Sequence, residues 1–350
     1  MQRQRRHKKI LKVIVLLSLC TFGFLQIRLL LVQERYSNAK DSSHQHVQLQ
    51  LQLPRDDEWK NRLFSQWTAS TTSTTANGGD GGIIIFVHVP KTGGTTIRDI
   101  FSNATRFPQI RYWALYSLKH FRAAQEEVDQ RLQSGPRSDY EKPILFVELH
   151  GHNTPTLVEL QSTLSTWKRQ ALEHKIPFFV FTLLRNPVDL AVSFFNFFHV
   201  FRDPRFGPQM EPTVDNLRQT LQWNPQCLYL VKGERPYFRP DLKYNVTAQD
   251  CHHVASILQD PSVMDWVGHT DRLSTETLPL LAHLVTMTAT ATIDPSFTTS
   301  SNVAATRRQR HRPLSKHELD VATMDTIRTM TQLDHKLYLQ TTTGTETMVP

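Results

Sequence analysis

The chain has 350 residues and a formal net charge of +8, which by itself would indicate an anionic partner. Seven of these positive charges lie in the first 32 residues, which contain no acid, so residues 33–350 carry a net charge of only +1. The distribution excludes a uniformly basic chain. We therefore expect no nucleic-acid partner, and any basic surface should be local, at the arginine-rich run 307–312.

The chain begins with a basic segment followed by an apolar one. Residues 1–12 include six lysines and arginines, and the apolar run that follows ends at Leu25, or at Val32 if two polar residues are tolerated. Counted as residues 10–32, it is long enough to span a bilayer. A cleaved signal peptide is the alternative, but no small-residue cleavage site follows Leu25. We therefore predict a cytosolic tail at 1–9, a transmembrane signal anchor and a lumenal remainder, which is type II topology.

The composition then changes twice. Residues 33–82 are rich in Gln, Ser, Thr, Asp and Gly, and they contain few residues that a core would bury, so we expect a flexible stem. Residues 83–340 are numerous enough for one domain with a sizeable core. Residues 341–350 are expected to be a disordered tail.

Short apolar runs alternate with longer helical patterns in the predicted domain. The apolar runs, which have the composition of buried strands, are 83–89, 144–149 and 178–184. The helical patterns lie around 95–102, 116–133 and 155–172. This alternation predicts an α/β fold, with a P-loop-like parallel sheet flanked by helices. Such sheets bind ligands outside the carboxyl ends of their strands, and the polar motifs lie there.

The segment after the first strand has the features of a phosphate site. Gly93 and Gly94 allow a tight turn, and a helix is expected to begin near Thr95. Free N–H groups at a helix start attract anions, and Lys91 adds an ammonium while Thr95 and Thr96 add hydroxyls. The lysine precedes the glycine pair, so this is not a Walker A loop. An ordinary turn with a surface lysine is the alternative.

A second anion-binding pattern follows the apolar run 178–184. Arg185 stands where that strand leaves the sheet, Pro187 suits the first position of a helix, and Ser193 lies roughly two turns further along. An arginine fork and a hydroxyl together bind a phosphate dianion well. An arginine that only forms an ion pair at the sheet edge is the alternative.

The strand at 144–149 leads into two histidines separated by a glycine. A neutral imidazole suits removal of a proton from a hydroxyl, so His150 or His152 is a candidate general base. Glu148 could orient a histidine or act itself. His-x-His can also belong to a metal site, but no further ligand set with suitable spacing follows, and we expect no metal.

Cysteines and asparagines give weaker indications. Cys20 lies in the predicted anchor, which leaves Cys227 and Cys251 as a lumenal pair that could form a disulfide or remain free thiols. Asn103 and Asn245 begin glycosylation sequons, which is consistent with a lumenal domain.

Pro-Lys-Thr-Gly-Gly-Thr-Thr at 90–96, with Arg-Asn-Pro at 185–187 and the serine in the next helix, resembles a known family. It is similar to the Golgi membrane-bound sulfotransferases that use PAPS (3′-phosphoadenosine 5′-phosphosulfate), closest to the heparan sulfate 2-O- and 6-O-sulfotransferases. The resemblance implies the sulfotransferase fold, a lumenal catalytic domain in the Golgi, and transfer of a sulfuryl group from PAPS to a glycan or polysaccharide hydroxyl.

The resemblance also implies roles for individual residues. Lys91 would hold the 5′-phosphate together with the loop amides, which are those of Thr92, Gly93, Gly94, Thr95 and Thr96. Arg185 and Ser193 would hold the 3′-phosphate. The 2-O enzymes carry His-Gly-His where His150 and His152 stand, whereas the 6-O enzymes carry Leu-His, so His150 fits both patterns.

Further matches lie towards the C-terminus. In related enzymes an asparagine like Asn302 precedes a basic segment that closes over the nucleotide; the run 307–312 could do this, meet an anionic acceptor, or be a solvated loop. Residues 224–233 and 265–273 resemble family segments, with Asp271 in place of a glutamate. Residues 315–339 predict one amphipathic terminal helix.

Two other classes of function compete with sulfotransfer. A nucleotide kinase with a divergent P-loop would need the Gly-x₄-Gly-Lys order, which is absent here. A glycan-binding protein without catalytic activity would keep the fold but should lose the nucleotide contacts or the base, yet Lys91, Arg185 and Ser193 are all present.

Overall fold

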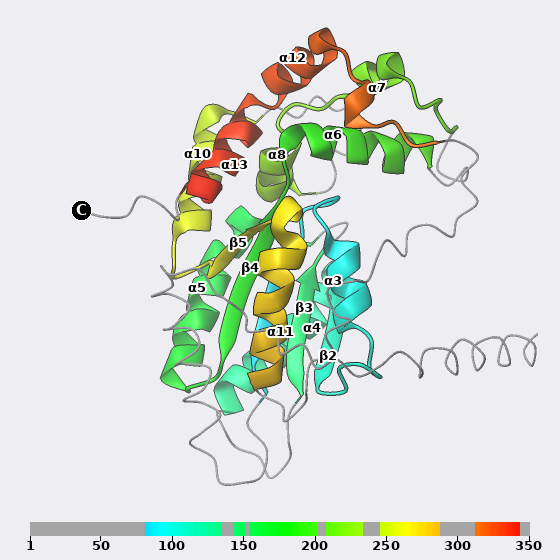
Figure 1. The fold of residues 1–350 in the computed structure, drawn as a ribbon. Coiled ribbons are helices and arrows are strands. Elements are labelled where there is room, and N and C mark those ends of the chain that lie inside the picture. Colours follow the sequence, from blue (N-terminus) through cyan, green and yellow to red (C-terminus); the bar gives the residue numbers. More distant parts are fainter. Residues whose placement is uncertain are drawn as a thin grey trace, which may run out of the picture. The chain divides into compact units, whose positions relative to one another are not determined.

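The computed structural model describes residues 81–115, 117–134, 143–150, 154–201, 208–233, 246–287 and 312–343 (Figure 1). The predicted cytosolic tail and anchor and nearly all of the predicted stem lie outside these ranges. Among the described residues, no helix combines the length and the apolar composition needed to cross a membrane.

Five parallel strands form one sheet in the order β2-β3-β1-β4-β5. The strands are β1 (Ile83–Val87), β2 (Ile110–Leu115), β3 (Ile144–Leu149), β4 (Phe178–Leu184) and β5 (Trp266–His269). The sheet confirms the predicted parallel α/β architecture. The two edge strands, β2 and β5, are additions to the three strands predicted from apolar runs.

Helices fill the connections between the strands. Those that the structure describes between β1 and β5 are α3 (Gly94–Phe101), α4 (Leu118–Ser134), α5 (Leu157–Glu173), α6 (Pro187–Phe195), α7 (Val214–Thr220), α8 (Pro225–Lys232) and α10 (Ala248–Gln259), with a π-helical turn, η1 (Asn196–Val200), after α6. Short turns η3 (Thr270–Arg272) and η4 (Leu273–Thr277) lead from β5 into α11 (Leu278–Met287). The described C-terminal part contains η7 (Lys316–Glu318), α12 (Val321–Met330) and α13 (Gln332–Thr343).

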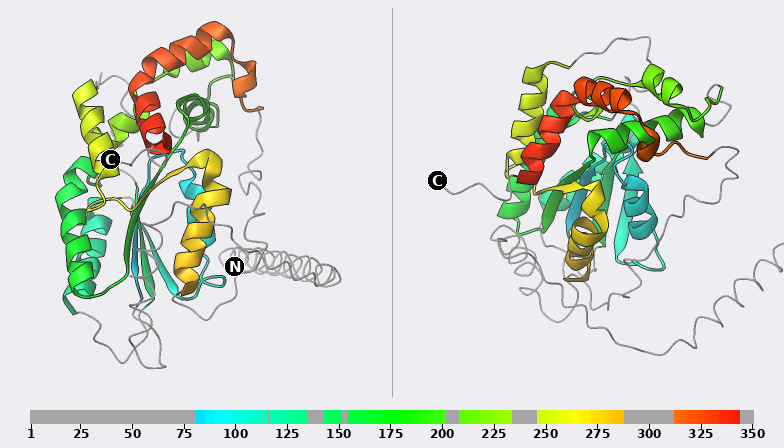
Figure 2. Two further views of the ribbon diagram at one scale, coloured as in Figure 1. Left: turned by 60° about the vertical axis from the view of Figure 1, so that its left-hand side comes forward. Right: turned by 45° about the horizontal axis from the view of Figure 1, so that its top comes forward.

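The sheet is covered on both faces (Figure 2). Ile83, Ile85 and Val87 of β1 pack into a core with α4, α5 and α10, whereas Ile84 and Phe86 point to the other face, towards α3 and α11. All five residues of β1 are buried, as a central strand between two helical layers requires. Helices α6, α7, α12 and α13 lie beyond the carboxyl ends of the strands, so they surround the edge where a ligand would bind (Figure 1).

The prediction of one continuous helix over residues 315–339 is wrong. The structure divides this segment into η7, α12 and α13. Asp320 caps the start of α12 by accepting a hydrogen bond from the Thr323 N–H at 2.7 Å, and Thr331 ends that helix. Apolar periodicity continues across the break, so it could not reveal the break.

The start of α8 is held by a carboxylate from α13. Buried Asp334 accepts hydrogen bonds from the N–H groups of Gln226 at 2.9 Å and Cys227 at 2.8 Å, which satisfies amides that the helix itself leaves open. Cys227 is also bonded to Cys251 of α10, with a sulfur–sulfur distance of 1.98 Å. The structure thereby realises the disulfide alternative for this pair, and α8 is fixed from two sides.

Asp334→Asn is expected to destabilise the fold by about 1–3 kcal/mol, because an amide can present an NH₂ group to one of the two buried N–H donors. Chemical denaturation would measure the loss. Asp325→Asn, which changes an exposed carboxylate on α12, is the matched control and should cost less than about 0.5 kcal/mol. Equal losses for the two variants would contradict this role of Asp334.

Candidate functional site

The predicted site residues follow adjacent strands of the sheet. β1 lies between β3 and β4, and the chain crosses from one side of β1 to the other between β3 and β4, so the strand order reverses there. A reversal of this kind is where open α/β sheets bind ligands. Lys91 follows β1, His150 follows β3 and Arg185 follows β4.

The loop after β1 has an unusual backbone that several contacts hold in place. Lys91 has φ +67° and Gly93 has φ +106°, both in the left-handed region. For a lysine this conformation costs about 1–2 kcal/mol relative to the right-handed one. The Thr92 hydroxyl donates to the Val89 carbonyl at 2.7 Å, and the Thr270 hydroxyl donates to the Thr92 carbonyl at 2.8 Å. The loop is thus held in one shape before any ligand arrives, as a preorganised site requires.

The loop runs into α3 with open amides. Gly94 is the first residue of α3, and within the part of the chain that the structure describes no side chain caps this helix. The first turn also contains no acid, so the positive end of the helix is not neutralised locally. The Thr96 N–H donates to the Gly93 carbonyl at 3.0 Å. This contact narrows the expected anion-binding amides to those of residues 92–95.

The ammonium of Lys91 lies inside the site. Its Nζ is 3.7 Å from the ring centroid of Phe197, a half-exposed residue of η1. Burial and then the nearby charge of Arg185 lower the pKa of Lys91 to about 8. An anion beside Lys91 would reverse this tendency, because it favours the charged form. Lys91 is therefore positioned where its charge lacks a carboxylate partner among the described residues.

Arg185 is joined to the same loop. Its Nη1 donates to the carbonyl of Lys91 at 3.0 Å, so the two predicted cationic residues lie side by side. The Gln226 side chain fixes the backbone of Arg185 in both directions, accepting from its N–H at 2.8 Å and donating to its carbonyl at 2.8 Å. This explains why a glutamine is needed at the start of α8. Asp334 holds that helix, and Gln226 in turn holds Arg185.

Glu148 is the centre of a buried polar network. Its Oε1 accepts from His88 Nδ1 at 2.7 Å, and its Oε2 accepts from Arg98 Nε at 2.9 Å and from the Tyr112 hydroxyl at 2.7 Å. Arg98 Nη2 also contacts Oε1, which makes the arginine bidentate. Burial alone would raise the pKa of Glu148, but the hydrogen bonds from His88 and Arg98 outweigh it and lower that pKa to about 2. A carboxylate that stays ionised favours an orienting role over the general-base alternative.

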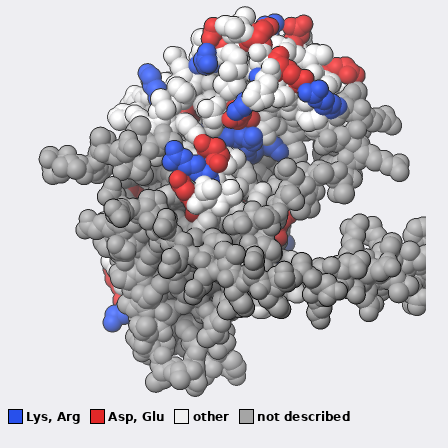
Figure 3. All heavy atoms as spheres, viewed as in Figure 1, with Lys and Arg blue, Asp and Glu red and all other residues white. Residues whose placement is uncertain are grey.

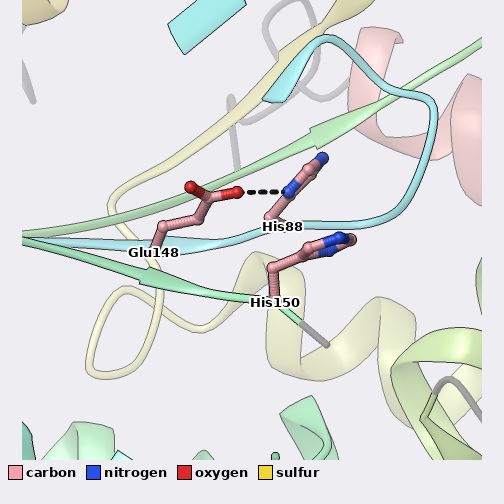
Figure 4. Close-up of side chains that lie close together, drawn as sticks. All are labelled: His88, Glu148 and His150. Atoms are coloured by element: carbon pink, nitrogen blue, oxygen red, sulfur yellow. Dashed lines mark hydrogen bonds and ion pairs between the residues drawn. The ribbon is translucent and has the colours of Figure 1, made fainter. Parts of the chain in front are cut away.

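The rings of His88 and His150 lie against each other beside this carboxylate (Figure 4). They follow the neighbouring strands β1 and β3, and their ring centroids are 4.2 Å apart. Burial, followed by the neighbouring His88, lowers the pKa of His150 to about 3. Burial also lowers the pKa of His88, against the raising effect of Glu148. Both rings are therefore neutral near pH 7 in the unliganded protein.

His88, Glu148 and His150 place possible metal ligands within 4.8 Å of one another. The arrangement fits a cation poorly, because Glu148 is already saturated by its three partners and the guanidinium of Arg98 would repel a second positive charge. The geometry favours an orienting carboxylate and a histidine pair.

The remaining predicted residues fall into two groups. Ser193 lies on α6, half-buried, and no hydrogen bond joins its side chain to Lys91 or Arg185 among the described residues. His152, Asn302, the run 307–311 and Asn245 lie outside the described residues. His88, Arg98 and Tyr112 were not predicted. His88 is the one with a readable signal, since it is a polar residue between the buried β1 and the glycine loop.

A surface cavity of about 360 Å³ lies at the start of α6, where Asn186 and Pro187 line it. Its wall includes Lys316, Arg328 and Asp189, and Lys316 is paired with Asp189 at 2.9 Å. Because its charges are partly compensated, we assign the anion site to the loop and Arg185, and the cavity is a neighbouring hollow.

The resemblance implies that this loop binds a nucleotide, and Gly94→Ala is then expected to abolish that binding, because a Cβ at Gly94 would overlap the ring of His88. Either the ring must leave Glu148 or the loop must move, and both changes disturb the anion site. Titration calorimetry with 3′,5′-adenosine bisphosphate (PAP) would measure the loss. Thr95→Ala, an exposed neighbour in the same turn, should reduce affinity less than tenfold, and similar losses for both variants would contradict the steric argument.

Compared with known protein families and with curated proteins, the sequence matches none.

Proposed function

We propose that the chain is a PAPS-dependent sulfotransferase that transfers a sulfuryl group to a hydroxyl of a glycan or polysaccharide. The observation that carries this proposal is the contact between Arg185 and the loop of Lys91, at the strand-order reversal of a parallel sheet. Two cationic residues that are 94 positions apart in the sequence are in contact there. The order of lysine and glycines differs from a Walker A loop, which favours PAPS over ATP.

The proposal assigns the two phosphate groups of the nucleotide, on the 5′ and 3′ positions of its ribose, to these two neighbouring cationic residues. When bound, PAPS supplies an activated sulfuryl group and a phosphate leaving group. Lys91 and the amides of residues 92–95 would hold the 5′-phosphate and stabilise the charge that develops on the leaving oxygen. Arg185, with Ser193, would hold the 3′-phosphate. This assignment implies that the observed α/β sheet belongs to the sulfotransferase fold.

The acceptor proton would pass to a histidine at the end of β3. His150 is the described candidate, and His152 remains the other. A neutral imidazole can accept a proton, and anionic groups of the bound substrates would raise the low pKa of His150 towards the working pH. Glu148 fixes the neighbouring His88 and thereby the stacked ring of His150.

The compartment and acceptor follow from weaker arguments. The Cys227–Cys251 bond suits an oxidising compartment, which agrees with a single-pass type II protein of the Golgi membrane. The described surface mixes charges of both signs around α7 and α12 (Figure 3), as in the pairs Arg218–Asp320 and Arg328–Asp325. A heparan-sulfate-like polysaccharide is one candidate acceptor, and it would need basic groups other than these paired arginines.

Titration calorimetry of the full chain with PAP and with ATP–Mg²⁺ tests the choice of nucleotide. We expect PAP to bind at least about tenfold more tightly than ATP–Mg²⁺, a difference of about 1.4 kcal/mol. Preferential binding of ATP–Mg²⁺ would instead support the kinase alternative. PAP binding without transfer to any acceptor would support the glycan-binding alternative.

A further inference from the structure

The ring of His88 is buried beneath the anion-binding loop with one nitrogen unsatisfied. Only 4% of His88 is exposed, and its Nε2 is buried with no hydrogen-bond partner among the residues that the structure describes. The other nitrogen, Nδ1, contacts Glu148 at 2.7 Å. Because an ionised carboxylate only accepts hydrogen bonds, Nδ1 must carry the proton, and in the neutral ring Nε2 is then a bare acceptor.

The unsatisfied nitrogen faces the place where an anion would bind. The ring edge that contains Nε2 lies against Gly94, the first residue of α3, since a Cβ there would overlap Cε1, Nε2 and Cδ2. Figure 4 shows the ring directed into the curve of the loop that follows β1. A buried polar atom without a partner is costly, so a ligand that supplies one is favoured at this position.

We propose that His88 is a binding residue for the donor nucleotide, and that it takes up a proton from solvent when the nucleotide binds. The uptake converts Nε2 into an N–H donor aimed at the anionic group on the loop, while Glu148 stabilises the resulting imidazolium through Nδ1. The inference rests on the proposed function, because it assigns His88 to the phosphate end of PAPS.

The groups around His88 explain why the proton is absent before binding. Arg98 from α3 and Lys91 from the loop add positive charge, Glu148 from β3 adds negative charge, and neutral His150 covers one face of the ring. Tyr112 from β2 donates to the same carboxylate of Glu148. Burial and the two cations keep the pKa of His88 below its ordinary value. A polyanion on the loop would offset Lys91 and Arg98 and raise this pKa.

Calorimetry of PAP binding at pH 7 in buffers of different ionisation enthalpy tests the proposal on the full chain. The dependence of the enthalpy on the buffer gives the number of protons taken up, which should be close to about one for the wild type. Lys91 contributes little at this pH, because with a pKa of about 8 only about a tenth of it is unprotonated. The wild-type affinity should also fall by up to about tenfold per pH unit between pH 6.5 and 7.5.

Two matched variants identify the group that titrates. His88→Gln should still bind PAP, more weakly and without proton uptake, whereas His150→Gln should retain the uptake. Uptake that persists in His88→Gln and disappears in His150→Gln would overturn the assignment, as would buffer-independent binding by the wild type. Absence of PAP binding by the wild type would overturn the proposed function as well, so the two failures are distinguishable. If His88→Gln fails to fold, the buffer dependence and the pH dependence of PAP binding by the wild type still test the proposal.

Discussion

Replacing Lys91 with alanine is expected to lower sulfuryl transfer from PAPS by at least about 10²–10³-fold, because it removes a preorganised donor from the developing charge of the leaving phosphate. The protein should still fold. Lys91 forms no ion pair with a carboxylate among the described residues, and its pKa of about 8 shows that burial already disfavours its charge. A radiolabelled-PAPS assay measures the rate, and thermal denaturation checks the fold.

Lys175→Ala is the matched control for this variant. Lys175 has φ +56°, so it too is a lysine in the left-handed region, but it is exposed and precedes β4 at the opposite end of that strand from Arg185. The two substitutions remove the same charge from similar backbone conformations. Transfer should remain near the wild-type rate in Lys175→Ala. Near-wild-type transfer by Lys91→Ala would remove the basis of the proposed mechanism.

Glu148→Gln is expected to cost stability and activity together. The substitution keeps the shape of the side chain but removes the charge that pairs with Arg98 and His88. Breaking a buried ion pair costs about 3–5 kcal/mol, and because the side chain of Arg98 is 27% exposed we expect the lower end, about 3 kcal/mol. The pH dependence has a definite sign. Because the folded pKa of about 2 lies below the ordinary value of 4.5, the contribution is present above pH 4.5 and lost as the pH falls towards 2.

Denaturant unfolding of Glu148→Gln at pH 7 and at low pH measures the loss of stability and its pH dependence. Tyr112→Phe removes one hydrogen bond from the same carboxylate and should cost about 1 kcal/mol, while most of the acid dependence remains because the contacts from His88 and Arg98 are kept. Glu276→Gln breaks the more exposed pair with Arg272 and should cost less than about 1 kcal/mol. A stability of Glu148→Gln equal to that of Glu276→Gln would show that the network contributes nothing.

The sequence predicted the parts of the fold that local pattern determines. The strands at Ile83, Ile144 and Phe178 are apolar runs, interrupted only by Glu148 in β3 and Thr182 in β4, and a parallel sheet buries such runs on both faces. β2 was missed because it is an edge strand, in which Arg111, Tyr112 and Trp113 interrupt the apolar pattern.

The polar network could not be read from the sequence because it depends on register. Glu148 of β3 is opposite Phe86 of β1, so the two side chains lie on the same face of the sheet. His88 is two residues after Phe86 and therefore lies on that face as well, within reach of Glu148. A shift of one residue would turn Glu148 to the other face. By contrast, the meeting of Lys91 and Arg185 was predictable, because both follow strands whose carboxyl ends share one edge of the sheet.

Transfer of labelled sulfate from PAPS to a panel of polysaccharides, oligosaccharides and tyrosine peptides tests the central claim most directly. The full chain should label at least one carbohydrate acceptor, and Lys91→Ala should label none above background while Lys175→Ala labels normally. Labelling of the peptides alone would contradict the proposed acceptor. The absence of transfer to every acceptor, by a folded chain that does not bind PAP, would contradict the account as a whole.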